Sequence, residues 1–410
     1  MARKEEQNLI VGLDIGSSKV VVVVGEISPE GGAQVVGVGS CPARGLKKGV
    51  VVNIESTVQS IQQAVKAAES MAGCRIHSVY AGISGSHIRG INSHGVTGIE
   101  RHEVSAEDVE RVIAAARVVA IPADQKILHI LPQEFIIDGQ EGIQEPVGMA
   151  GVRLEARVHI VTGAVSAEQN IVKCVQLCHL EVDDVILQPL ASSRAVLTPD
   201  EKERGVCLLD IGAGTTDLAV FRHGAIGHTE IIPVAGNQVT NDIAAMFHTP
   251  TPAAEEIKIQ HACCLRSLTR ANELIEVPGV GDRTARTLSR RELAEVVEPR
   301  YEELFEMAWS KLQHSGFEHL IPAGIVLTGG ASQVEGVMEL AEAVMHLPVR
   351  RGLPRDVTGP PDVVRNPMYA TAVGLLLFGY ENQSGGLNPG LRAGRKGWWA
   401  RFKGWLQGNF

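Results

Sequence analysis

One short pattern occurs twice in this chain, and it restricts the possible folds more than any other feature. The two segments are "IVGLDIGSSKVVVVV" (10–24) and "GVCLLDIGAGTTDLAVF" (205–221). In each of them an apolar strand ends in Asp-Ile-Gly, small residues follow, and a second apolar strand comes next. The repeat predicts two antiparallel hairpins with tight turns, and hence two lobes of related architecture.

Both predicted turns suit the binding of phosphate. Glycine lets an anion approach the backbone because no Cβ intervenes, and the N–H groups and hydroxyls of a tight turn can bind it. Asp14 and Asp210 stand immediately before the turns and are the candidate ligands of a hydrated Mg²⁺, which favours carboxylates and keeps several waters. The predicted phosphate-binding residues are Gly16, Ser17, Ser18, Lys19, Gly212, Gly214, Thr215 and Thr216.

Three more segments follow the pattern of a nucleotide-binding cleft. "AGIVLTGGASQVEGV" (323–337) predicts a buried strand, a turn at Gly329 and Gly330, and a helix that lies against a base or a ribose. "QPLASSRAVL", which begins at Gln188, and "YATAVGLLLF", which begins at Tyr369, predict helices rich in small residues. Small residues allow helices to cross closely, as a hinge between two lobes requires. Each helix alone could be ordinary packing, but the five elements in this order indicate a shared site.

Composition limits the class of protein. The chain has 410 residues, 44% of them hydrophobic but only 4% aromatic, which favours buried sheets rich in Val and Ile. A formal net charge of −9 argues against nucleic-acid binding. No signal-peptide core is evident and no apolar run reaches the roughly 20 residues of a membrane-spanning helix, so we expect a cytosolic protein. Seven irregularly spaced cysteines predict buried thiols, with a metal site at Cys174 and Cys178 as the less favoured alternative.

The five elements resemble the superfamily of actin, sugar kinases and heat-shock chaperones. That resemblance implies an α/β fold of two duplicated lobes with mixed five-stranded sheets, and Mg·ATP in the cleft between them. Glu255 and Lys258 match the helix that contacts adenosine, although an exposed ion pair is an equally good explanation of their spacing. Gln188 matches the residue that positions the attacking water; Gln is a poor base, so we expect at most weak ATPase activity.

Segments outside the nucleotide motifs resemble the FtsA family of bacterial cell-division proteins over almost the whole chain. They include "GISGSHI", "ILPQEFIIDG", "LASSRAVLTPDE", "VAGNQVTNDIA" and "VEPRYEEL". The resemblance implies an α/β subdomain inserted in the first lobe, a small upper subdomain in the second, and a C-terminal amphipathic helix. The expected boundaries are 1–84 and 163–197 for the first lobe, 85–162 for the insert, 198–237 and 318–380 for the second lobe, 238–317 for the upper subdomain, 381–397 for a flexible tether and 398–410 for the terminal helix.

The same resemblance implies the partners. The upper subdomain is expected to bind the C-terminal peptide of the tubulin-like ring protein FtsZ, with Arg300 as the most direct basic contact and Arg290 and Arg291 beside it. A solvated basic edge is the alternative for the last two. The insert is expected to face neighbouring protomers of a filament and later-acting division proteins. Together these features imply an adaptor that ties FtsZ filaments to the cytoplasmic face of the inner membrane at the division septum.

The C-terminal tail "GRKGWWARFKGWLQGNF" (394–410) predicts membrane binding from its own pattern. It carries three of the four tryptophans, and no Asp or Glu follows Glu381. On a helix, its aromatic residues form one stripe with basic residues at the flank, as in helices that lie in the surface of an anionic membrane. The predicted membrane-contacting residues are Trp398, Trp399, Phe402, Lys403, Trp405 and Leu406. Packing of the tail against the body is the alternative.

Three other functions of the superfamily fit the residues less well than the adaptor does. A small-molecule kinase requires a catalytic Asp in an acceptor pocket, and no additional substrate-binding segment is evident. A chaperone ATPase requires a large domain after the second lobe, where only 30 residues follow Tyr380. A pilus-assembly actin homologue is similar in its lobes, but the tail and "VEPRYEEL" favour cell division.

Overall fold

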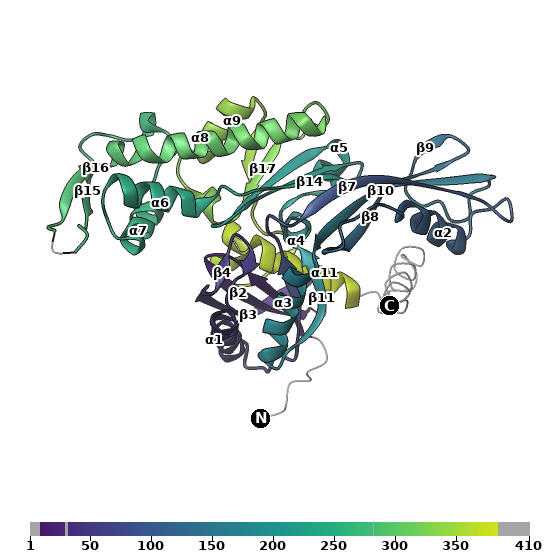
Figure 1. The fold of residues 1–410 in the computed structure, drawn as a ribbon, viewed down its shortest axis with the longest axis horizontal. Coiled ribbons are helices and arrows are strands. Elements are labelled where there is room, and N and C mark those ends of the chain that lie inside the picture. The colour runs from purple at the N-terminus through teal and green to yellow at the C-terminus, as the bar shows by residue number, and fades with distance from the viewer. Residues whose placement is uncertain (1–8, 29–31, 282, 384–410) are drawn as a thin grey trace.

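Each repeated hairpin belongs to a sheet of the same topology. The computed structural model describes residues 9–28, 32–281 and 283–383. In the first sheet the strand order is β11-β6-β1-β2-β3-β19, and in the second it is β14-β13-β12-β17-β18. Figure 1 shows the sheet with β2 and β3, in purple, apart from the sheet with β14 and β17, in teal and green. In each sheet three strands form an antiparallel meander, and two parallel strands extend it beyond the first strand of the hairpin. The predicted duplication is therefore confirmed.

The strands of the two sheets coincide with the apolar segments of the sequence. The first sheet contains β1 (Leu9–Ile15), β2 (Lys19–Ile27), β3 (Ala33–Pro42), β6 (Ser78–Ile83), β11 (Glu181–Leu187) and β19 (Val357–Thr358). The second contains β12 (Val206–Ile211), β13 (Thr216–Arg222), β14 (Ala225–Ile232), β17 (Ile325–Thr328) and β18 (Val349–Arg351). Five consecutive valines of β2, 20–24, are fully buried, because this strand lies inside the sheet with both faces covered.

Helices cover both faces of each sheet. The outer face of the first sheet packs against α1 (Ile54–Ala72) and α3 (Val165–Leu177), and that of the second against α8 (Arg290–Ser315) and α9 (Val337–Met345). Between the sheets lie α4 (Gln188–Val196) and α11 (Ala370–Gln383), whose small and apolar side chains form one core with residues of both sheets. A Cβ at Gly374 would lie only 1.9 Å from the carbonyl oxygen of Ala191, so the two helices touch backbone to backbone. The predicted close crossing is present.

One strand number and one boundary differ from those expected. The first sheet has six strands in place of five, because β19, from the C-terminal half of the chain, pairs with the start of β3. The helix α11 continues through Gln383, beyond the expected start of a tether at residue 381. Arg194 donates from Nε to Glu381 Oε1 at 2.7 Å and so fixes this last turn on α4. The rest of the expected tether and the whole terminal helix (384–410) lie outside the described residues.

The inserted subdomain is a four-stranded antiparallel sheet with one helix. It contains β7 (Arg89–Gly98), β8 (Gln125–Ile137), β9 (Gln140–Ile143), β10 (Arg153–Ala164) and α2 (Ala106–Ala116). Ser105 and Asp108 form a capping box at the start of α2. The apolar face of α2 packs on the sheet through Val109, Val112 and Ile113.

The insert also contacts the second lobe, along the edge strand β14. Asn92 Nδ2 donates to the carbonyl oxygen of Gly227 at 3.1 Å, and Gln133 Nε2 donates to that of Ile226 at 3.0 Å. The ring of His159, which is buried, lies 2.9 Å from the Thr229 hydroxyl through Nε2. Burial, together with the nearby His228, lowers the pKa of His159 to about 3, so its imidazole is neutral. These contacts cover β14, an edge strand that would otherwise be open.

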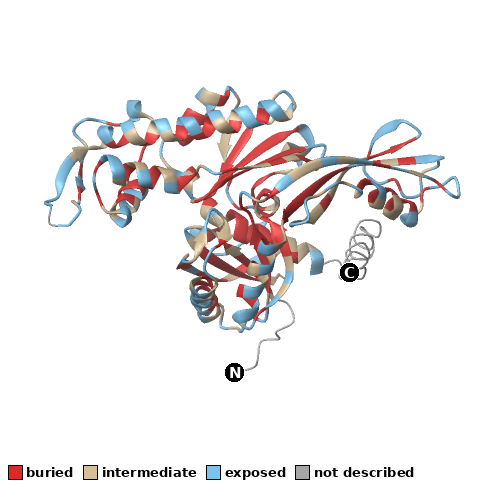
Figure 2. Ribbon diagram, in the orientation of Figure 1, coloured by how far each residue is buried: buried red, intermediate tan, exposed pale blue. Residues whose placement is uncertain are grey.

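The upper subdomain of the second lobe is built mainly from helices. It comprises α6 (Gly236–Met246), α7 (Thr251–His261), the hairpin of β15 (Leu274–Val277) and β16 (Arg286–Ser289), and the first turns of α8. The strands of the central sheets are mostly buried, whereas the far end of the insert and the β15–β16 hairpin are exposed (Figure 2). Of the helices in the described part of the chain, none has both the length and the apolarity needed to cross a membrane.

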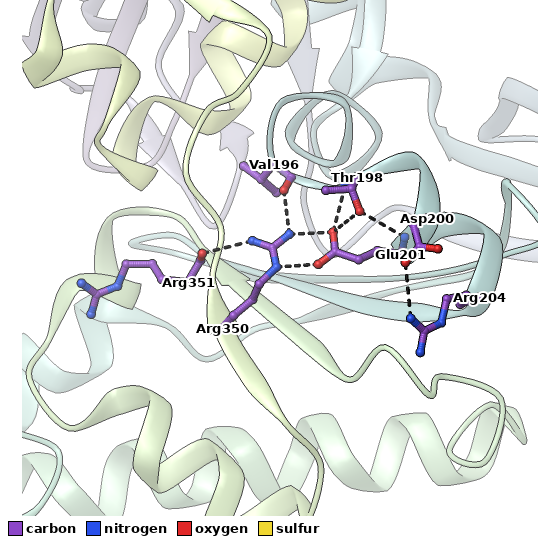
Figure 3. A network of polar contacts seen from close by, with 7 residues as sticks. All are labelled: Val196, Thr198, Asp200, Glu201, Arg204, Arg350 and Arg351. Atoms are coloured by element: carbon purple, nitrogen blue, oxygen red, sulfur yellow. Dashed lines mark hydrogen bonds and ion pairs between the residues drawn. The ribbon is translucent and has the colours of Figure 1, made fainter.

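Arg350 of β18 binds the segment in which the chain crosses from the first lobe to the second. Its guanidinium donates to Glu201 Oε1 and Oε2 at 2.5 and 2.7 Å, and to the carbonyl oxygen of Val196 at 2.9 Å (Figure 3). Glu201 also closes a capping box with Thr198 at the start of α5 (Pro199–Arg204). A bidentate pair of this kind fixes orientation as well as distance. The end of α4 is thereby fixed to the second sheet.

Candidate nucleotide-binding site

The two predicted phosphate turns are closed by the same backbone hydrogen bond and face each other. Gly16 N donates to the carbonyl oxygen of Lys19 at 3.0 Å, and Gly212 N donates to that of Thr215 at 3.1 Å. A Cβ added at Gly214 would lie 2.5 Å from Ser17 Oγ, so the second turn approaches the first as closely as glycine allows. The structure thus brings the predicted turns of the two lobes together.

Three carboxylates gather behind the turns. Asp14 is the penultimate residue of β1 and accepts a hydrogen bond from Gln188 Nε2 at 2.9 Å. Asp210 is the penultimate residue of β12 and accepts one from Thr371 Oγ1 at 3.1 Å. The third is Asp217, which lies directly opposite Asp210 in the register of β12 and β13. It accepts hydrogen bonds from Ser84 Oγ at 2.7 and 2.9 Å, and this contact joins the first lobe to the second.

Burial disfavours the ionised form of the carboxyl groups in this site. Burial, with a contribution from Asp210, raises the pKa of Asp14 to about 7 and that of Asp217 to about 8; burial also raises the pKa of Asp210. Lys19 Nζ is buried with no hydrogen-bond partner in the described structure, and burial lowers its pKa to about 8. Its ammonium lies 5.2 Å from the ring centroid of Tyr369. A buried ammonium without a hydrogen-bond partner, beside buried carboxylates, suits the binding of a phosphate and a divalent cation.

The glycine turn of the third motif packs directly on Asp210. Gly329 has a φ of +85°, and a Cβ there would lie 2.5 Å from Asp210 Oδ1, so only glycine fits. Gly330 begins a 3₁₀ helix (Gly330–Gln333) in place of the predicted helix start, and α9 follows at Val337. The turn lies beside the second phosphate turn, as the sequence pattern predicts.

Glu255 and Lys258 are not an exposed pair. Lys258 is buried, and its Nζ donates to Glu255 Oε2 at 2.7 Å, to Thr240 Oγ1 at 3.0 Å and to the carbonyl oxygen of Gly236 at 3.1 Å. Gly236 N in turn donates to the carbonyl oxygen of Gly212 at 3.1 Å. The pair therefore lies beside the second phosphate turn, where the resemblance places adenosine.

Some predicted phosphate ligands have their side chains engaged elsewhere. The Thr216 hydroxyl is buried and donates to the carbonyl oxygen of Val234 at 2.8 Å. Ser17 Oγ accepts a hydrogen bond from Gly49 N at 2.9 Å, and Ser18 is exposed. In the described residues, no group of three or more His, Cys, Asp or Glu is arranged to enclose a metal ion directly. Carboxylates that bind a hydrated Mg²⁺ through water do not need such a cage.

Asp217 and Ser84 were not found from the sequence. A signal for Asp217 was present, because it lies seven residues after Asp210 across a tight turn and so returns to the position opposite it. The matching position of the first hairpin is Val21, paired with Asp14, so the duplication itself gave no hint of a third carboxylate. Ser84 lies in a loop and is brought to the site only by the folding of both lobes.

The predicted basic contacts on α8 differ in how they are bound within the molecule. Arg290 is paired with Glu273 and Glu335. Arg300 donates to Asp242 through Nε at 2.5 Å and is also paired with Glu303. Arg291 is exposed, and no ion pair of its guanidinium is present in the described part of the chain. The three arginines thus occupy one helix, but only Arg291 is open to a partner without exchange of an existing ion pair.

Solved structures of actin-like proteins have the same fold. The chain is similar to a PilM–PilN complex of type IV pilus biogenesis, with a TM-score of 0.68, 18% identity, and coverage of 90% of this chain and 98% of that one. It is also similar to MreB5 of Spiroplasma citri bound to AMPPNP, with a TM-score of 0.56, 14% identity, and coverage of 93% and 100%. Two duplicated lobes around paired phosphate turns define an actin-like ATPase fold.

Sequence relatives identify the family within this class. The model described as cell division protein FtsA matches residues 207–374, and that of the SHS2 domain inserted in FtsA matches residues 85–162. The chain is 59% identical to the cell division protein FtsA of Pseudomonas aeruginosa and 46% identical to that of Escherichia coli K12, with 100% of both chains covered in each case. The chain belongs to the FtsA family of cell-division proteins, actin homologues that carry this insert.

Proposed function

We propose that this protein is an ATP-binding adaptor that anchors FtsZ filaments to the cytoplasmic face of the inner membrane at the division septum. Its membership of the FtsA family and its facing pair of phosphate turns support the proposal. The kinase and pilus alternatives have less support, since the likeness to the pilus protein lies in the fold at 18% identity.

ATP with Mg²⁺ is the proposed cofactor. The turns at Gly16 and Gly212 would hold its phosphates with the Lys19 ammonium, and Asp14 and Asp210 would hold the ion through water. The bound ion would neutralise phosphate and carboxylate charge that burial makes costly. Gly329, Gly330, Glu255 and Lys258 would adjoin the nucleoside.

Hydrolysis is a minor part of the proposal. The side chain of Gln188 donates from Nε2 to Asp14 Oδ1, and it could orient a water beside that carboxylate. An amide cannot take up the proton of that water at neutral pH, so turnover would be slow. Nucleotide then acts chiefly on conformation and self-assembly.

The two proposed attachment points lie in different segments of the chain. Arg291 and Arg300 on α8 would meet the acidic C-terminal peptide of FtsZ. The terminal segment, with Trp398 and Trp405, would lie in an anionic membrane surface, where each basic residue adds about 1 kcal/mol. The insert would contact neighbouring protomers and later division proteins. Polymerisation would strengthen membrane attachment through avidity.

One experiment tests the adaptor role. Anionic vesicles should sediment a labelled FtsZ tail peptide when the full chain is present, but not with a chain that lacks residues 397–410. The truncated chain should still bind the peptide in solution, as measured by anisotropy, which serves as the control. Within the tail, Trp405→Glu should abolish sedimentation and Trp399→Glu, at the edge of the stripe, should weaken it less. Sedimentation of the truncated chain with peptide, or its failure with the full chain, would refute the proposal.

A further inference from the structure

The short hairpin of β4 (Leu46–Lys47) and β5 (Val50–Val51) carries a strained lysine at its tip. Lys47 pairs with Val50, which leaves Lys48 and Gly49 as a two-residue turn with φ of +50° and +77°. Positive φ at both positions is the type I′ geometry, for which Asn-Gly is the preferred sequence. A lysine in this left-handed conformation costs about 1–2 kcal/mol, so its presence is not explained by the turn itself.

This turn lies between the two phosphate turns. Gly49 N donates to Ser17 Oγ of the first turn at 2.9 Å. A Cβ added at Gly214 of the second turn would lie 3.2 Å from the Cα of Lys48. The turn also adjoins the loop that supplies the Asp217 contact, because a Cβ at Gly49 would lie 2.8 Å from the carbonyl oxygen of Ser84. One residue thus adjoins elements of both lobes.

The position of Lys48 along the second turn indicates which phosphate it faces. The proposed nucleoside side of the cleft, with Lys258, adjoins the Gly212 end of that turn through Gly236. Lys48 adjoins the Gly214 end, two residues farther along. A phosphate chain that runs from the nucleoside along the turn therefore ends beside Lys48.

The charged groups of the site are compatible with a cation beside the Gly214 end of the second phosphate turn. Three acidic side chains lie behind the turns, and Lys19, whose Nζ atom is buried, is the lysine next to Asp14. Lys48 is exposed, and none of the hydrogen bonds or ion pairs found in residues 9–28, 32–281 and 283–383 involves its ammonium. Its flexible four-carbon stem allows the ammonium to turn into the cleft as a compact point charge.

We propose that the Lys48 ammonium binds the terminal phosphate of a nucleoside triphosphate and gives the site its preference for the triphosphate over the diphosphate. The inference rests on the proposed nucleotide function and assigns to it a specificity-determining residue. The diphosphate ends before this position, so its affinity should not depend on the charge of Lys48.

The test compares the affinities of the full chain for AMPPNP and ADP with Mg²⁺, measured by calorimetry. Lys48→Asn removes the charge and creates the Asn-Gly sequence that the turn prefers, so the hairpin is retained. Lys48→Arg keeps the charge, and Lys47→Gln, one residue away on the same hairpin, is the matched control. We expect Lys48→Asn to weaken AMPPNP about tenfold and ADP less than twofold, as befits loss of one charge-assisted contact. Lys48→Arg should restore most of the difference, and Lys47→Gln should leave it unchanged.

The outcomes separate the inference from the function on which it rests. If Lys48→Asn keeps the affinity ratio of the unmodified chain, or loses affinity for both nucleotides equally, Lys48 does not select the terminal phosphate. If the unmodified chain binds neither nucleotide, the proposed nucleotide site itself is wrong.

Discussion

Substitution of Gly374 by Ala tests whether the contact of α4 with α11 supports the site as well as the fold. The added Cβ would lie 1.9 Å from the carbonyl oxygen of Ala191 and 2.3 Å from its carbon. Carbon and oxygen ordinarily approach to about 3.3 Å, so the helices must separate by more than 1 Å. Insertion of one methyl group into a packed core costs about 1–3 kcal/mol.

The same displacement should reach the cleft. Gln188 begins α4 and bonds Asp14, while Thr371 lies on α11 and bonds Asp210. A hydrogen bond contributes about 0.5–1.5 kcal/mol, and 1.4 kcal/mol is a tenfold change. We therefore expect nucleotide affinity to fall about threefold to tenfold.

Two measurements decide the matter. The midpoint of thermal unfolding should fall by about 2–12 °C, on the basis of about 2–4 °C per kcal/mol for domains of 150–250 residues. Titration with a fluorescent ATP analogue should show the weaker binding. Gly98→Ala is the control, because a Cβ at Gly98 meets nothing within 4 Å. A Gly374→Ala protein with both the melting midpoint and the affinity of the unmodified chain would show that the helices separate at no cost, and the reasoning would fail.

Two further predictions concern charge. Burial raises the pKa of Asp14 to about 7 and that of Asp217 to about 8, from 3.8 in the unfolded chain. As pH rises, the unfolded state therefore releases these protons before the folded state does. The free energy of unfolding of the nucleotide-free protein should fall as pH rises from about 4 to about 8. Asp217→Asn should flatten that decline in urea titrations at successive pH values, and an unchanged slope would contradict the assignment. Arg291→Glu should weaken binding of the FtsZ tail peptide about tenfold without lowering the melting temperature. Arg300→Glu should weaken binding and also lower the melting temperature, because the variant loses the ion pair with Asp242. Equal peptide affinity in both variants and the unmodified chain would place the binding site elsewhere.

The sequence predicts what short-range pattern determines. The repeated hairpins and the small-residue helices predicted at Gln188 and Tyr369 follow from local rules, and the structure contains both kinds of element. Pairings between distant segments were not predictable in this way. The two residues of β19 join β3 across more than three hundred positions, and no local signal marks Val357 as a strand.

The site shows the same division. The turns were found because glycine and aspartate occur at fixed spacing, but Asp217 requires the strand register and Ser84 requires the packing of two lobes. The spacing of Lys258 from Glu255 fits a surface ion pair as well as an internal one, and the burial of Lys258 shows that the pair is internal. The left-handed lysine at residue 48 depends on a turn type that the letters "KKGV" do not reveal.

The shared core between the sheets has a consequence for how the chain folds during its synthesis. Domains generally fold as units, the N-terminal one first, as they leave the ribosome. Here the first sheet lacks its inner cover until α11 is made, since Leu376 fills the space left by Gly25, and a Cβ at Gly12 would lie 2.3 Å from the carbonyl oxygen of Ala372. The N-terminal lobe is therefore translated early but completed only when α11 has been made, and until then it must expose the apolar face that α11 will cover.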